Sequence, residues 1–128
     1  MASNFVFDTN IFIYYLNANP NVEIYFDKDF LTKNNIYYSV ITEIELLSFP
    51  KLEDEEIEGI RSLPNRFLKL TLTEDIKEKT IEIKKKYKVG LGDSVIAAST
   101  LVYNAGLITR NEEDFAKITE LTFTNPFK

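Results

Sequence analysis

The sequence contains no cysteine and no histidine, and these two absences remove many of the common catalytic groups. Without cysteine there is no disulfide framework and no thiolate nucleophile, which suits a reducing cytoplasm. Without histidine there is no Ser-His-Asp triad and no histidine-based zinc site. Any catalysis must therefore rest on carboxylates, amides, hydroxyls, lysine, arginine or tyrosine.

Long apolar runs and an excess of positive charge are also missing. No apolar stretch approaches the ~20 residues that span a bilayer, and the amino-terminal residues do not form a signal peptide, so we expect a cytoplasmic protein with no membrane partner. The formal net charge of −5 argues against a protein that simply coats nucleic acid. An acidic enzyme that meets phosphate through a bound metal remains compatible with this charge.

The 128 residues, which we expect to form one domain over residues 1–128, alternate between strand-like and helix-like segments. Strands are predicted over residues 5–7, 36–40, 67–70, 107–109 and 121–123, with helices over residues 9–16, 22–32, 42–48, 52–63, 74–87 and 93–103 and a short one from residue 110. Ser39 and Thr42 are both candidates to cap the third helix, and Gly106 is predicted to end a helix in the left-handed conformation. This alternation predicts a parallel sheet covered by helices on both faces.

Acidic residues stand at the ends of predicted strands and the starts of predicted helices. Asp8 follows the first strand, at the carboxyl end where open α/β sheets bind ligands. Taken singly, Asp8, Asp93 and Asn111 are each explained more simply as helix caps. Glu43 and Glu45 lie two apart on one helix and so point in different directions. Glu45 stands among apolar residues that should face the core, where an unpaired carboxylate is costly.

Several carboxylates converging on one cleft would repel one another and resist ionisation. A hard divalent cation resolves that conflict, and ligands that are all oxygen suit Mg²⁺ or Mn²⁺ rather than zinc. Such a site orients water and stabilises charge at a phosphodiester. The acids therefore predict phosphodiester hydrolysis without histidine.

Four segments of the chain together resemble the successive motifs of a known family. Residues 8–10, 41–46, 93–98 and 109–115 are similar to those of PIN-domain ribonucleases, in particular the VapC-type toxins of bacterial type II toxin–antitoxin systems. The resemblance implies a three-layer α/β/α sandwich around a five-stranded parallel sheet. It also implies an endoribonuclease that depends on Mg²⁺ or Mn²⁺, forms a homodimer and is silenced by a cognate antitoxin.

The same resemblance assigns roles to individual residues. It implies that Asp8, Glu45 and Asp93 bind metal, because the family's glutamate directly precedes a leucine, which selects Glu45 over Glu43. Asp114 is expected as a further catalytic and metal-binding acid, with Asn111 as a neutral candidate ligand beside it. Thr9, Asn10 and Thr109 are expected to support the site by hydrogen bonds, and Arg110 is a candidate contact to substrate phosphate.

Two alternative interpretations stay open at this point. One is a PIN-like scaffold used only for binding, in which the acids have lost their catalytic role. The other is a signalling receiver domain with a phospho-accepting aspartate. A receiver domain would require adjacent acids after the first strand and an aspartate at the end of the third, where this chain has Lys69, Leu70 and Thr71.

Overall fold

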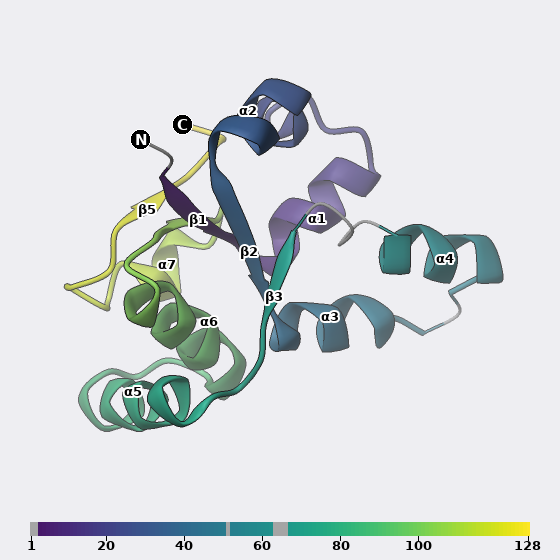
Figure 1. Cartoon of the computed structure of the whole chain (residues 1–128). Helices are drawn as coiled ribbons and strands as arrows, with labels where there is room; N and C mark the ends of the chain where they lie inside the picture. Colours follow the sequence, from purple (N-terminus) through teal and green to yellow (C-terminus); the bar gives the residue numbers. More distant parts are fainter. Residues whose placement is uncertain (1–2, 51, 63–66) are drawn as a thin grey trace.

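The computed structural model of the chain describes residues 3–50, 52–62 and 67–128. Its five strands form one sheet in which every pairing is parallel, in the order β3-β2-β1-β4-β5 (Figure 1). The strands are β1 (Asn4–Phe7), β2 (Asn35–Ser39), β3 (Leu68–Leu70), β4 (Gly106–Ile108) and β5 (Phe123–Thr124). β1 is therefore the central strand, paired with β2 on one side and β4 on the other. This confirms the predicted parallel sheet.

Helices cover both faces of the sheet. They are α1 (Thr9–Leu16), η1 (Glu23–Phe26), α2 (Lys28–Lys33), α3 (Val40–Leu47), α4 (Asp54–Ser62), α5 (Glu74–Lys86), α6 (Leu91–Val102) and α7 (Glu112–Phe115). In Figure 1, α5, α6 and α7 lie on one side of the sheet, and α1, α2 and α4 lie on the other. The predicted three-layer α/β/α architecture is confirmed.

Neighbouring residues of β1 belong to two different cores, because side chains alternate between the faces of a strand. Val6 packs among aliphatic residues of α5 and α6, where Ala97 and Ala98 allow a close approach to the sheet. Phe7 packs among aromatic rings on the opposite face, 5.3 Å from Phe26 and 5.7 Å from Phe67 between centroids. Both Val6 and Phe7 are fully buried.

The single helix predicted over residues 22–32 is wrong. The structure has η1 and α2 there, separated by Asp27, whose backbone is extended with a ψ of 147°. The break allows the rings of Phe26 and Phe30 to pack against Phe7 and Phe5. Aromatic packing therefore overrides the helical spacing of this segment.

Several helix boundaries also differ from the prediction. α3 begins at Val40, before the predicted start at residue 42, because Ser39 and not Thr42 caps it. Asn104, and not Gly106, takes the positive φ after α6, at 51°, while Gly106 begins β4. α6 begins at Leu91 with Gly90 in the cap position, so Asp93 lies inside its first turn and does not cap it.

The starts of α3 and α5 follow the expected capping chemistry. Ser39 caps α3, because its side chain accepts a 3.1 Å hydrogen bond from the backbone N–H of Ile41. Thr73 caps α5 in the same way through Ile76. α4 confirms the predicted helix within the described residues, and Leu63, at the end of the predicted span, lies outside them. Among the helices described, none has the length and apolar character needed to cross a membrane.

Candidate active site

Asp8 lies at the carboxyl end of β1 and is fixed by three hydrogen bonds. Its Oδ1 accepts from the backbone N–H of Thr9 at 2.8 Å, which makes Asp8 the cap of α1. Its Oδ2 accepts from the hydroxyl of Thr109 at 2.7 Å, and its own N–H donates to the carbonyl of Ile108 at 3.0 Å. Asp8 therefore caps a helix and is also tied to the end of the neighbouring strand β4.

Glu45 points from α3 toward α1. Its Oε1 accepts a 2.6 Å hydrogen bond from the hydroxyl of Thr9, which also lies 3.0 Å from the hydroxyl of Thr42. The expectation that Glu45 faces the core is wrong, because its side chain is exposed. Glu43 is half-buried and forms a 3.5 Å ion pair with Lys69 of β3. Glu45 therefore differs from Glu43 in the direction in which its side chain leaves α3, and it is not the more deeply buried of the two.

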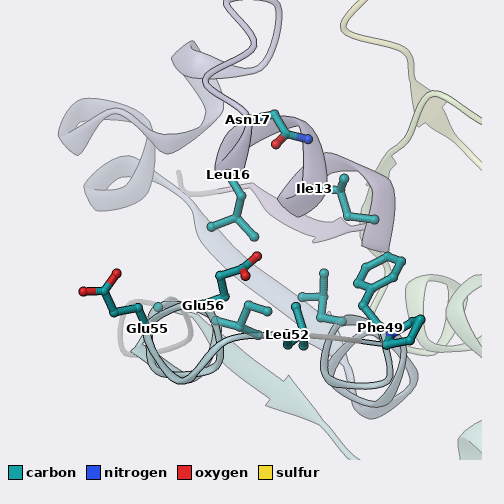
Figure 2. Close-up of a pocket in the computed structure, with 11 residues that line it drawn as sticks. Ile13, Leu16, Asn17, Phe49, Leu52, Glu55 and Glu56 are labelled. Carbon is teal, nitrogen blue, oxygen red and sulfur yellow. The ribbon is translucent and has the colours of Figure 1, made fainter.

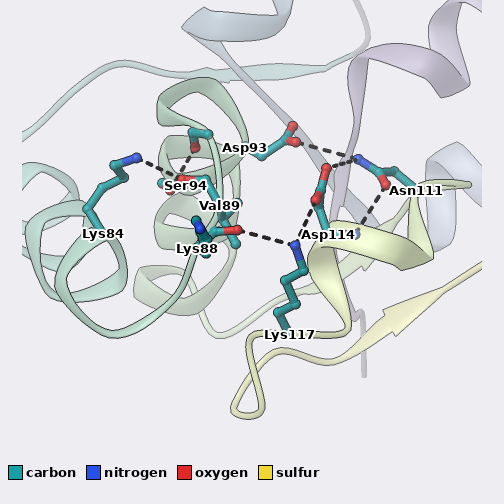
Figure 3. Close-up of polar contacts among 9 residues, drawn as sticks. Lys84, Lys88, Val89, Asp93, Ser94, Asn111, Asp114 and Lys117 are labelled. Atoms are coloured by element: carbon teal, nitrogen blue, oxygen red, sulfur yellow. Dashed lines mark hydrogen bonds and ion pairs between the residues drawn. The ribbon is translucent and has the colours of Figure 1, made fainter.

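Asp93, Asn111 and Asp114 form a second polar group beside the first. The Nδ2 of Asn111 donates to Asp93 Oδ2 at 3.5 Å and to Asp114 Oδ2 at 3.3 Å (Figure 3). The Oδ1 of Asn111 accepts from the backbone N–H of Asp114 at 3.3 Å, which caps α7. Asn111 thus uses its carbonyl for the helix and its amino group for the two acids.

One open cleft of about 480 Å³ brings most of the predicted residues together at the carboxyl edge of the sheet. It is lined by Asp8, Thr9, Asn10, Ile13, Glu45, Ser48, Phe49, Asp93 and Asn111. Three predicted residues do not line it. Thr109 is fully buried where it supports Asp8, and Asp114 and Arg110 lie outside the lining.

Arg110 is engaged by aromatic side chains. It donates a 2.9 Å hydrogen bond to the hydroxyl of Tyr14, and its guanidinium carbon lies 4.0 Å from the ring centroid of Phe127. Both contacts leave part of the guanidinium open, because Arg110 remains exposed. The structure therefore holds this cation in place one residue before Asn111.

Burial and mutual repulsion shape the charge of the cleft. Desolvation raises the pKa of Asp8 to about 6, with smaller contributions from the negative charges of Asp93 and Glu45, while hydrogen bonds from Thr109 and Thr9 oppose the rise. Burial also raises the pKa of Asp93, helped by the charges of Asp114 and Glu45. The acids are close enough to disfavour one another's ionisation, as expected of a site that receives a cation.

The cleft offers oxygen donors of the kind that hard divalent cations prefer. Besides the three carboxylates, the Oδ1 of Asn10 is buried without a hydrogen-bond partner in the described part of the chain. A buried carbonyl oxygen without a donor is costly, and a cation would satisfy it. No three acidic side chains within residues 3–50, 52–62 and 67–128 form a ready-made metal site. The donor set therefore fits Mg²⁺ or Mn²⁺ in its chemistry, and binding requires the side chains to draw together.

Several residues near the site were not assigned to it from the sequence, including Thr42, which was considered only as a helix cap. Thr42 precedes Glu45 by three residues, and this spacing places both on one face of a helix. The spacing could therefore have predicted that Thr42 lies beside Glu45. Lys117 follows Asp114 by three residues and pairs with it at 3.4 Å. Ser48 and Phe49 come just after α3, and no local pattern predicts that they line the cleft.

Comparison with known proteins places this geometry in a family. The chain is similar to VapBC-1 from nontypeable Haemophilus influenzae, with 29% identity over 98% of this chain and 99% of that one, and a TM-score of 0.83. It is similar to a toxin-antitoxin complex from Klebsiella pneumoniae, with 27% identity over 96% and 98% of the two chains and a TM-score of 0.75. DNA-bound VapBC from Salmonella typhimurium has 20% identity over 98% and 99% of the chains and a TM-score of 0.82, which shows the same fold.

Among curated proteins none matches this sequence. Residues 5–121, however, match the PIN domain family, a span that includes every acid of the cleft. The chain therefore belongs to the PIN domain family.

Proposed function

We propose that this chain is an endoribonuclease dependent on Mg²⁺ or Mn²⁺, and that it is the cytoplasmic toxin of a toxin–antitoxin pair. One observation carries the proposal: Asp8, Glu45 and Asp93, from three separate elements, line a single cleft at the carboxyl edge of the sheet. Membership of the PIN domain family supports a nuclease. Similarity to VapBC-1 and to the Klebsiella pneumoniae complex supports the toxin role.

Asp8, Glu45 and Asp93 are the residues that would hold the ion, with the orphan carbonyl of Asn10 beside them. The bound metal would supply positive charge at the phosphodiester and lower the pKa of water. The contribution of the protein itself is to orient the carboxylates that would bind the metal. Thr109 and the N–H of Thr9 fix the two oxygens of Asp8.

We assign proton transfer to Glu45 and contact with the substrate to Arg110. Glu45 keeps one carboxylate oxygen on Thr9, and its exposed side chain is suited to accept the proton of an attacking water. Arg110 is proposed to contact an RNA phosphate, because it directly precedes Asn111 of the cleft and its exposed guanidinium is oriented by Tyr14 and Phe127.

An apolar groove continues from the cleft and supports the proposed antitoxin partner. It shares Ile13 and Phe49 with the cleft and extends along α1 to α4. Figure 2 shows Ile13 and Leu16 on α1 facing Phe49 and Leu52 across this groove. Glu55 and Glu56 also line the groove, so it suits a segment with apolar side chains and basic flanks. We propose that the antitoxin docks there. The homodimer is likewise a proposal, tested by the mass of the chain in analytical ultracentrifugation.

The receiver-domain interpretation conflicts with the sheet. Receiver domains have strand order 2-1-3-4-5, in which the third strand lies on the far side of the first. Here β3 pairs with β2 at the edge of the sheet. A catalytically inactive binding scaffold is the second candidate, and an activity assay distinguishes it from a nuclease.

The test is cleavage of RNA by the purified chain with Mg²⁺ or Mn²⁺. Asp8→Asn, Glu45→Gln and Asp93→Asn are each expected to abolish cleavage while the circular dichroism spectrum stays unchanged. Glu43→Gln is the matched control, because this glutamate pairs with Lys69 away from the cleft, and it should cleave normally. An inactive wild-type protein that binds RNA would favour the scaffold. Full activity in Glu45→Gln together with loss of activity in Glu43→Gln would mean that the wrong glutamate was chosen.

A further inference from the structure

Asp114 is already bound by two side chains of the protein itself. Its Oδ1 lies 3.4 Å from the Nζ of Lys117, and its Oδ2 accepts from the Nδ2 of Asn111 at 3.3 Å (Figure 3). Asp8 also has a donor on each oxygen, but those donors are a neutral hydroxyl and a backbone N–H, whereas one donor to Asp114 is an ammonium group that offsets its negative charge.

Asn111 presents hydrogens to the space between Asp93 and Asp114. Its Nδ2 donates to an oxygen of each acid, while its Oδ1 is turned away to cap α7. An amide nitrogen has no lone pair to offer a cation. An ion between the two acids would require this amide to turn over and give up the cap.

Lys117 is itself held in place by the backbone before α6. Its Nζ donates to the carbonyl of Lys88 at 3.3 Å as well as to Asp114. The next carbonyl, that of Val89, accepts from the Nζ of Lys84 at 2.8 Å. Two ammonium groups thus hold the loop that leads into the helix carrying Asp93, as Figure 3 shows.

We infer that Lys117 is the built-in counter-charge of Asp114, and that the site takes one divalent ion, in the cleft, instead of a second between Asp93 and Asp114. The inference rests on the proposed function, since it assumes that Asp8, Glu45 and Asp93 bind Mg²⁺ or Mn²⁺. It gives Asp114 a positioning role rather than the ligand role expected from the sequence. It agrees with the absence of Asp114 from the residues that line the cleft.

The experiment counts Mn²⁺ ions bound to the full chain, by isothermal titration calorimetry and by the electron paramagnetic resonance signal of free Mn²⁺. The wild type is expected to bind one ion. Lys117→Met, which removes the ammonium group and keeps the length of the side chain, is expected to bind a second, weaker ion. Lys79→Met is the matched control, because Lys79 pairs with Glu82 and Glu120 instead, and it should bind one ion.

Asp114→Asn provides a second test that does not depend on the folding of the Lys117 variant. It is expected to bind one ion with the affinity of the wild type, whereas Asp93→Asn loses tight binding. Two ions in the wild type, a single ion in folded Lys117→Met, or weakened binding in Asp114→Asn would each overturn the inference and leave the proposed nuclease intact. A wild type that binds no Mn²⁺ would instead overturn the proposed metal dependence.

Discussion

Thr9 joins the first helix to the third, because its hydroxyl donates a 2.6 Å hydrogen bond to Glu45 across the cleft. The same residue donates its backbone N–H to Asp8 at 2.8 Å. Two of the three cleft acids are thus oriented by one threonine. Its hydroxyl contacts Glu45 and the neighbouring Thr42, whereas its backbone N–H contacts Asp8. A change of the side chain alone can therefore remove the bond to Glu45 and keep the bond to Asp8.

Thr9→Val is expected to lower the rate of RNA cleavage roughly 10–100-fold, as is usual when a residue that orients a metal ligand is removed. The backbone bond to Asp8 remains, so the fold should be unchanged by circular dichroism. Thr9→Ser restores the hydroxyl and should recover most of the activity. Equal activity in the valine variant and the wild type would mean that Glu45 does not need this bond.

The metal-free protein should lose stability as the pH rises through the titration of Asp8. The pKa of this carboxyl is raised to about 6 by burial, from an ordinary value of 3.8, so the folded state holds its proton more tightly than the unfolded state. Stability from this group is complete below pH ~4 and is lost by about pH 7, at a cost of about 3 kcal/mol.

Asp8→Asn removes this dependence and is therefore expected to gain stability over the wild type as the pH is raised from 4 to 7.5. The measurement is urea denaturation in EDTA at both pH values, with the difference between the two proteins compared. Added Mn²⁺ should stabilise the wild type and leave the variant unchanged. A constant difference across the pH range would contradict the raised pKa.

Arg110→Ala should raise the KM for RNA roughly tenfold and leave kcat nearly unchanged, because one charge-assisted contact to phosphate is worth about 1.5 kcal/mol or more. Steady-state kinetics on a short RNA measures both constants. Arg61→Ala, which removes an exposed arginine of α4, is the control for net charge. A loss confined to kcat would assign Arg110 to chemistry instead of binding.

Leu16→Lys should weaken inhibition by the cognate antitoxin, because it places a charge in the apolar groove. Leu16 is 46% exposed, and the change should therefore leave folding intact. Leu91→Lys alters a leucine that is 66% exposed on α6, outside the groove, and should be silenced normally. Growth of bacteria that express each variant with and without the antitoxin reports the difference. Normal silencing of Leu16→Lys would argue for another docking surface.

The layers of the fold were predictable because strand-like and helix-like segments alternate, and the caps at Ser39 and Thr73 follow local chemistry. The boundaries that failed depend on distant contacts. Asp27 interrupts the helical pattern where the ring of Phe26 packs against Phe7, and Asn104 takes the left-handed conformation because the chain turns there before β4 begins at Gly106.

In the site, too, features set by local sequence could be predicted and features set by distant contacts could not. Asp8 was noted because it follows a predicted strand. Its hydrogen bond with Thr109 joins positions 101 residues apart, and no local sequence pattern predicts it. Glu45 was selected over Glu43 by the resemblance to the family motif, and its expected burial was wrong. It lines the cleft because its side chain leaves α3 toward α1. The topology of the sheet could be predicted from the sequence, whereas the directions of individual side chains could not.

The hydrogen bond between Thr109 and Asp8 also bears on how the protein folds during its synthesis. β1 is synthesised before β4, yet the aspartate that follows β1 is not fixed until β4 pairs beside it. Contacts between such distant positions form late in folding. A nascent chain on the ribosome therefore carries Asp8 without this hydrogen bond until β4 has been synthesised and has paired with β1.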